Sequence, residues 1–147
     1  MPTTDNKKLK VLILIISMSL FFLHLPSCWY ACFIYMFLHA NIFHLAVNLY
    51  ALWMIRLDKN RVISSYIISV FAYLLFPNAI GLSGMILAIV GMYANKKTWL
   101  YFAGFSIVTV FIPGIAFGVH TVCFISGYLY NKVRALVNDY RAAYTGR

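Results

Sequence analysis

The chain has 147 residues, of which 63% are hydrophobic and only 10% are charged, and its mean hydropathy is +0.84. Soluble domains average about 45–50% apolar and about 25% charged residues, so this composition favours a membrane protein and leaves no room for a second domain. The net charge of +9 does not indicate a nucleic-acid partner, because the basic residues stand in short clusters without interleaved aromatic residues.

Six uncharged apolar runs predict an all-α integral membrane protein with six transmembrane helices. The runs cover Val11 to Leu25, Phe33 to Ile55, Val62 to Phe76, Ala79 to Ala94, Trp99 to Ile112 and Ile115 to Tyr130. Pro77 ends the third run and Pro113 ends the fifth. Several runs are shorter than the ~20 residues that a crossing usually needs, so we expect helices extended by flanking residues or a locally thinner bilayer.

The basic residues set the orientation of these spans. They form four clusters: Lys7, Lys8 and Lys10; Arg56, Lys59 and Arg61; Lys96 and Lys97; and Lys132, Arg134, Arg141 and Arg147. A cytoplasmic N-terminus and six crossings place all four clusters inside, and the outer connections around Pro26, Pro77 and Pro113 then carry no basic residue.

We therefore expect a multi-pass protein of a cell membrane (a bacterial inner membrane or a plasma membrane) with both termini in the cytoplasm. The expected parts are a cytoplasmic N-terminal segment (1–10), a six-helix domain with a rhomboid-like bundle (11–131) and a basic cytoplasmic tail (132–147). The tail is expected to be an amphipathic or frayed extension at an anionic surface.

The N-terminal stretch permits a second interpretation. Basic residues before an apolar run resemble a signal peptide, and Leu25 to Cys28 loosely resembles a lipoprotein cleavage site, although Pro26 fits poorly; cleavage would leave five spans. The three cysteines give no complete disulfide framework. Cys28 and Cys32 are close enough to pair on the predicted outer side, but the favoured interpretation makes them small apolar packing residues.

Polar side chains inside a span cost free energy unless they have partners, so they mark candidate sites. In the second span, His44 and Asn48 are four residues apart and share one helix face. His39, five residues before His44, faces elsewhere or lies just outside the helix. Taken alone, these residues fit a packing network, a zinc or copper site, or a catalytic site.

A serine stands between glycines at the outer start of the fourth span, where Gly81 to Gly84 read Gly-Leu-Ser-Gly. Small neighbours leave the hydroxyl of Ser83 accessible, and free N–H groups at a helix N-terminus suit a developing oxyanion. The same segment also fits helix packing, because Gly84, Ala88 and Gly91 form a ridge of small residues.

The sixth span carries His120, with Cys123 and Gly127 on the same face. A lone histidine in a span is usually structural or part of a proton relay. All acidic residues lie on the predicted cytoplasmic side: Asp5, Asp58 and Asp139. A Ser-His-Asp triad is therefore excluded, and a Ser-His dyad remains.

Depth connects these three places. His44 lies near the outer end of the second span, Ser83 about four residues into the fourth and His120 about five residues into the sixth. At about 1.5 Å per residue, Ser83 and His120 lie within a few ångströms of the same depth. Polar groups at one level of one leaflet indicate a single site.

Together the motifs resemble the rhomboid family of intramembrane serine proteases. The segment FLHANIFHLAVN (37–48) resembles the second-helix signature of the family, a His followed by HxxxN. Gly81 to Gly84, followed by Gly91, resembles the fourth-helix GxSG segment. His120, in a short helix that ends at Gly127, resembles the HxxGxxxG segment. The order, helix numbers and topology match over about residues 30 to 130.

The resemblance implies a role for each matching position. Ser83 would be the nucleophile and His120 the general base, and His44, Asn48 and the backbone around Gly81 and Ser83 would bind the oxyanion. Three further positions would support the site: His39, Gly84 and Gly127. Neither a metal nor another cofactor is implied. The implied substrates are membrane proteins whose transmembrane segment contains a helix-destabilising stretch, entering laterally from the lipid bilayer, and no nucleic acid.

The chain also departs from the family pattern. Cys123 replaces the glycine expected three residues after His120, Leu87 stands where many members have a tyrosine stacked on the histidine, and the segment 29–31 lacks a Trp-Arg pair. These departures favour an alternative, a catalytically weak or inactive rhomboid-like protein that binds membrane-protein clients. A metal or proton transporter is a third alternative, which would favour intramembrane carboxylates or paired unwound helices, and the sequence indicates neither.

Overall fold

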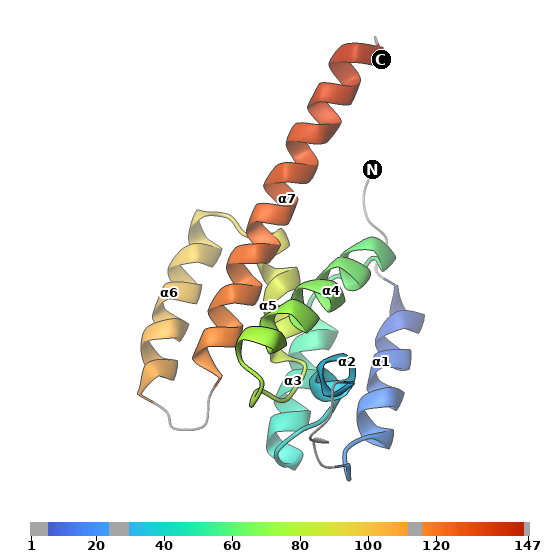
Figure 1. Cartoon of the computed structure of the whole chain (residues 1–147), viewed down its shortest axis with the longest axis vertical. Helices are drawn as coiled ribbons and strands as arrows, with labels where there is room; N and C mark the ends of the chain where they lie inside the picture. Colours follow the sequence, from blue (N-terminus) through green and yellow to red (C-terminus); the bar gives the residue numbers. More distant parts are fainter. Residues whose placement is uncertain (1–5, 24–29, 112–115, 146–147) are drawn as a thin grey trace.

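A computed structural model of the chain describes residues 6–23, 30–111 and 116–145, and these residues are all-helical, without strands. In chain order the helices are α1 (Lys7–Ser19), α2 (Ala31–Ile34), the 3-10 helix η1 (Tyr35–Phe37), α3 (Ile42–Met54), α4 (Lys59–Leu75), α5 (Ser83–Met92), α6 (Lys96–Val110) and α7 (Phe117–Thr145) (Figure 1). The all-α class expected from the sequence is confirmed. Some predicted features lie outside the described residues: Asp5, Leu25 to Cys28, Ile112 to Ile115 and Arg147.

Side-chain caps fix where several helices begin. In four of them an Asn or Asp oxygen accepts a hydrogen bond from a backbone N–H of the first turn: Asn6 in α1, Asn41 in α3, Asp58 in α4 and Asn95 in α6. A cap of this kind contributes about 1 kcal/mol, because it satisfies an N–H that has no partner within the helix. The caps therefore start α1, α4 and α6 in the basic clusters, three or four residues before the predicted apolar runs, and start α3 inside its run.

The second predicted span is wrong as a single helix. The sequence predicts one helix over Phe33 to Ile55, but the α2–η1 segment and α3 meet at 85°. At the break, Asn41 is extended, with φ −162° and ψ 172°, and its side chain accepts a hydrogen bond from the N–H of His44 at 2.9 Å. The asparagine thus starts a new helix where the apolar run continues, and His39 lies outside α3.

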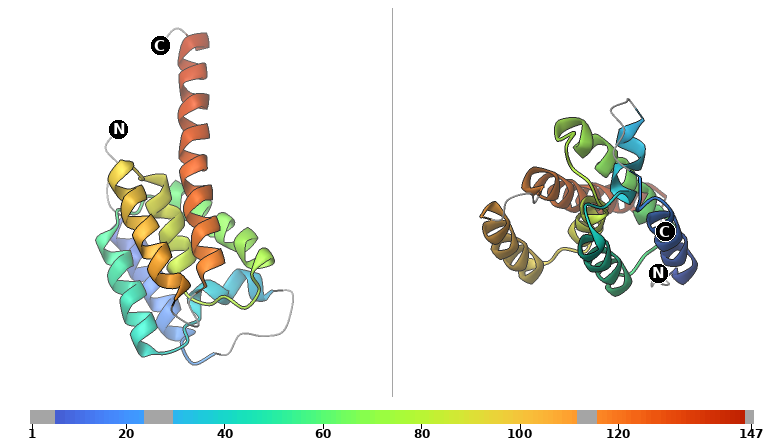
Figure 2. Two further views of the ribbon diagram at one scale, coloured as in Figure 1. Left: turned by 90° about the vertical axis from the view of Figure 1, so that its left-hand side faces the viewer. Right: turned by 90° about the horizontal axis from the view of Figure 1, so that it is seen from below.

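The fourth and sixth spans also have different bounds. Helix α5 begins at Ser83, four residues after the predicted start at Ala79, because Gly81 has φ +103° and keeps the preceding turn non-helical. Helix α7 runs through the predicted boundary between residues 131 and 132 and continues to Thr145. The C-terminal half of α7 projects beyond the bundle (Figure 2).

No single helix in the described part of the chain is both long enough and apolar enough to cross a membrane. The α2–η1 segment and α3 reach that length and composition only as a bent pair, and α5 is apolar but has 10 residues.

Helix α5 lies in the middle of the bundle and packs most extensively against α7 (Figure 1). Glycines permit this close approach: a Cβ atom at Gly91 would lie 2.1 Å from the carbonyl oxygen of Phe124, and one at Gly127 would lie 2.0 Å from that of Ala88. No other residue fits these positions without separating the helices. The α5–α7 interface therefore sets how the first turns of the two helices face each other.

Three of the four basic clusters lie at one end of the bundle. The N–H of Asn6 donates to the carbonyl of Leu57 at 2.9 Å, which joins the start of α1 to the α3–α4 connection. The guanidinium of Arg61 lies 3.6 Å from the ring centroid of Tyr93, which joins the α5–α6 connection to the same place. We call residues 6–10, 56–61 and 93–97 the basic end. Helices α5 and α7 begin at the opposite end.

Candidate active site

Ser83 and His120 form a hydrogen-bonded pair at the starts of two packed helices. Ser83 is the first residue of α5, His120 lies in the first turn of α7, and Ser83 Oγ is 2.8 Å from His120 Nε2. The residues are 37 positions apart in the chain, so the α5–α7 interface brings them together. Ser83 is half-buried and His120 is only 6% exposed. This is the arrangement of a nucleophile and a general base.

The second ring nitrogen of this histidine, Nδ1 of His120, is buried and has no hydrogen-bond partner among the described residues. The two described acidic residues are elsewhere: Asp58 pairs with Arg61 at 3.2 Å at the basic end, and Asp139 is exposed on the projecting part of α7. In the described part of the chain the pair is therefore a dyad, without the carboxylate that orients the base in a triad.

The turn before Ser83 places a glycine against two polar side chains. Gly81 has φ +103°, and a Cβ atom there would lie 2.7 Å from His44 Cε1 and 3.3 Å from Asn48 Nδ2. Both the backbone conformation and the space thus require glycine. The N–H of Gly81 donates to the carbonyl of Tyr35 at 3.1 Å, which anchors the turn to η1. His44 and Asn48 consequently lie beside the backbone that leads into Ser83.

Asn48 offers a buried donor at this turn. Its side chain is 4% exposed, and Nδ2 has no hydrogen-bond partner among the described residues. Buried donors are nearly always paired, so an unpaired one beside a serine calls for a functional explanation. An amide donor in this position is suited to stabilising an oxyanion. His44 lies close enough to His120 that charges on the two rings would repel each other.

His39 packs against the candidate oxyanion group His44. The two ring centroids are 5.2 Å apart in an edge-on arrangement, and His39 Nδ1 lies 3.1 Å from the carbonyl oxygen of Phe37. Because a carbonyl only accepts, His39 carries its proton on Nδ1 and is held in one orientation. The described residues contain no group of three or more His, Cys, Asp or Glu side chains that could hold a metal ion.

The positions that depart from the family pattern have specific surroundings. The buried Cys123 Sγ lies 3.3 Å from where a Cβ atom of Gly84 would stand, so the thiol fills the α5–α7 interface without separating the helices. Leu87 is half-buried in α5. The ring of Phe105 in α6 lies beside His120, with the two ring centroids 5.8 Å apart and an interplanar angle of 40°. The sequence analysis missed Phe105.

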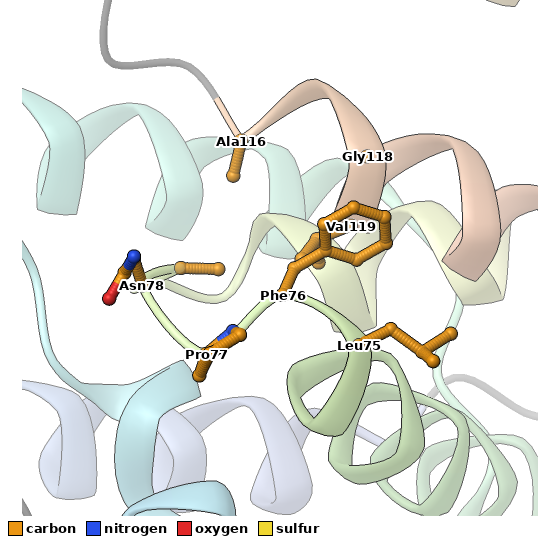
Figure 3. A pocket seen from close by; sticks show the side chains of 8 residues that line it. Leu75, Phe76, Pro77, Asn78, Ala116, Gly118 and Val119 are labelled. Atoms are coloured by element: carbon orange, nitrogen blue, oxygen red, sulfur yellow. The ribbon is translucent and has the colours of Figure 1, made fainter.

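A cavity of about 380 Å³ opens at the end of the bundle where α7 begins (Figure 3). Its walls come from the α4–α5 connection and the start of α7, with Phe76, Asn78 and Val119 among the lining residues. The Phe76 ring packs against Gly118, where a Cβ atom would clash with it. Val119, which lines the cavity, also lies 3.1 Å from where a Cβ atom of Gly84 would stand, so the cavity adjoins the α5–α7 interface.

Comparison of the chain with protein-family models, with curated proteins and with solved structures finds no match in any of the three. The resemblance to the rhomboid family therefore rests on the three sequence motifs alone.

Proposed function

We propose that the chain is an intramembrane serine endopeptidase of the rhomboid type that acts through a Ser83–His120 dyad. The observation that carries this proposal is the 2.8 Å hydrogen bond between Ser83 Oγ and His120 Nε2. These two residues belong to separate sequence motifs and are 37 positions apart in the chain, yet their side chains are within hydrogen-bond distance. His44 and Asn48 of the remaining motif lie beside Gly81, in the turn that leads into Ser83.

In the proposed reaction, His120 Nε2 takes the proton of Ser83 as the oxygen attacks a peptide carbonyl. Asn48 Nδ2, the His44 ring and the backbone N–H of Ser83 stabilise the negative oxygen of the tetrahedral intermediate. His120 then gives the proton to the nitrogen of the scissile peptide bond. The bond breaks, the amine product leaves, and the acyl group stays on Ser83 as an acyl-enzyme. A water molecule, deprotonated by His120, hydrolyses the acyl-enzyme and regenerates Ser83.

The surface of the bundle supports a membrane location. Large apolar side chains are exposed on the outward faces of several helices, including Phe43, Val47, Phe71, Leu100 and Phe111. A soluble monomer rarely exposes apolar patches of this extent. Because α1, α3, α4, α5 and α6 have at most 17 residues each, the proposal includes a bilayer that is thinned around the protein.

The proposed orientation puts the basic end in the cytoplasm and the dyad near the outer face. Substrates would be membrane proteins that enter laterally from the lipid, with a helix-destabilised segment whose extended backbone reaches Ser83. An impermeant maleimide tests this orientation on intact cells, in a background without the native cysteines. Asn78→Cys at the cavity should react and Lys97→Cys at the basic end should not; the reverse result refutes the orientation.

Labelling with a fluorophosphonate serine probe tests the catalytic proposal on the purified protein in detergent. The wild type should be labelled, Ser83→Ala and His120→Ala should not, and Ser65→Ala should be labelled like the wild type. Ser65 is the matched control because it is a buried serine whose hydroxyl bonds to the carbonyl of Val62, far from the motifs. A folded wild type without labelling would reject the protease and favour the client-binding protein.

A further inference from the structure

We infer that Phe105 of α6 is a positioning residue for His120, as the last member of an aromatic ladder that joins α6 to α7. The inference rests on the proposed function for the role of His120. It concerns what holds the imidazole ring in place, because the described residues provide no carboxylate for that purpose.

Aromatic side chains at regular intervals along α6 and α7 form this ladder. On α6 they are three residues apart, at Trp99, Phe102 and Phe105; on α7 the facing rings are four residues apart, at His120, Phe124 and Tyr128. These intervals place each set on one face of its helix. The ring centroids are 5.3 Å apart for Trp99–Tyr128, 4.9 Å for Trp99–Phe124, 3.8 Å for Phe102–Phe124 and 5.8 Å for Phe105–His120.

The ladder is the main attachment of α6 to α7. The buried residues of α6 are Phe102 and Thr109, whereas large apolar residues on its other faces, such as Tyr101 and Ile107, are exposed. A Cβ atom at Gly104 would meet nothing within 4 Å. The packing of a few rings therefore determines where Phe105 stands relative to His120.

His120 needs such a contact because only one of its ring nitrogens is held. Nε2 bonds to Ser83, but Nδ1 has no described partner, so hydrogen bonding alone leaves the ring free to tilt. In a triad the acid fixes the ring from the second nitrogen. Here the Phe105 ring, 40° from the imidazole plane, restricts the tilt by contact. Phe105 thus orients the base without touching the substrate.

The first experiment measures the maximal rate of probe labelling, kinact, separately from the probe concentration for half-maximal rate, KI. Phe105→Leu should lower kinact by about three- to tenfold at unchanged KI, the size expected for one aromatic contact. Phe105→Tyr should restore kinact, because Phe105 is 43% exposed and a hydroxyl has room to reach outward.

Phe102→Leu is the matched control. Phe102 is 7% exposed, and its ring stacks on that of Phe124 with an interplanar angle of 6°. Because Phe102 is the more buried ring, Phe102→Leu should lower the thermal unfolding midpoint more than Phe105→Leu does. It should leave kinact within about twofold of wild type, because Trp99 still packs on Phe124 and Tyr128 and keeps α6, and with it Phe105, in place. Equal kinact in Phe105→Leu and wild type would overturn the inference and leave the proposed protease standing.

A second measurement does not require catalysis. Diethyl pyrocarbonate modification of His120, followed by peptide mass spectrometry, should be several-fold faster in Phe105→Leu than in wild type and unchanged in Phe102→Leu. If wild type is not labelled by the serine probe, the proposed protease function fails. The modification rates of His120 still decide whether Phe105 positions the imidazole ring. Equal modification rates of His120 in wild type and Phe105→Leu would overturn it.

Discussion

Substitution of Gly127 by alanine tests whether the α5–α7 interface holds the dyad together. A Cβ atom at Gly127 would lie 2.0 Å from the carbonyl oxygen of Ala88, whereas ordinary contacts begin near 3.4 Å. The obstacle is backbone, which cannot rotate away like a flexible side chain. We therefore expect α7 to move from α5 by about 1 Å, enough to break the 2.8 Å bond between Ser83 and His120.

The expected size combines two opposing contributions. Alanine favours a helix over glycine by about 1 kcal/mol, and forced overpacking costs about 1–3 kcal/mol or more for a backbone clash. Gly127→Ala should therefore lose up to about 2 kcal/mol of unfolding free energy, and more if the backbone clash exceeds the usual overpacking cost. A 1 Å displacement of reacting groups costs on the order of a hundredfold in rate, so probe labelling of Ser83 should fall at least tenfold.

Gly104→Ala provides the matched control, because its Cβ atom would meet nothing within 4 Å. This variant should gain up to about 1 kcal/mol of unfolding free energy from helix propensity and label at the wild-type rate. Thermal unfolding and labelling kinetics on both variants check the prediction. If Gly127→Ala is as stable and as reactive as Gly104→Ala, the close glycine packing does not position the dyad.

Three further predictions concern other parts of the chain. Asn48→Ala should lower the rate of Ser83 acylation by about a hundredfold, while thermal unfolding shows a stability within about 1 kcal/mol of wild type, because its buried Nδ2 has no described partner to lose. Tyr35→Phe should lose about 1 kcal/mol in the same assay, because its buried hydroxyl donates to the carbonyl of Ser69 at 2.8 Å. Deletion of residues 133–147 should change neither the unfolding midpoint nor the labelling rate, since the side chains described there are exposed.

The helices of the bundle could be predicted where sequence signals agree. Uncharged runs between basic clusters locate α1, α4 and α6, and Asp58 and Asn95 cap the last two at the edges of those runs. The second span could not be predicted from hydropathy, because residues 33–55 are apolar on both sides of the bend. The available signal was Asn41, a good cap that a continuous helix leaves unused.

The meeting of Ser83 and His120 could be anticipated from their predicted depth, but not at hydrogen-bond distance. That distance depends on the approach of α5 to α7, which Gly91 and Gly127 permit and which a list of small residues does not fix in register. The contact from Phe105 was missed for a related reason. Its signal is the three-residue spacing of aromatic residues on α6, which becomes informative only when the four-residue spacing on α7 is set against it.

The position of the dyad also explains why the candidate site combines firm and weak constraints. Ser83 stands two residues after Gly81, whose N–H is anchored to Tyr35, and α5 is buried at the centre of the bundle, so the proposed nucleophile is held from several sides. His120 has one hydrogen bond and a ring contact from α6, a helix attached mainly by aromatic side chains. A displacement of α6 therefore acts on His120, the proposed general base, before it acts on Ser83. Substitutions along the ladder should separate activity from stability, whereas substitutions at the α5–α7 glycines should change both together.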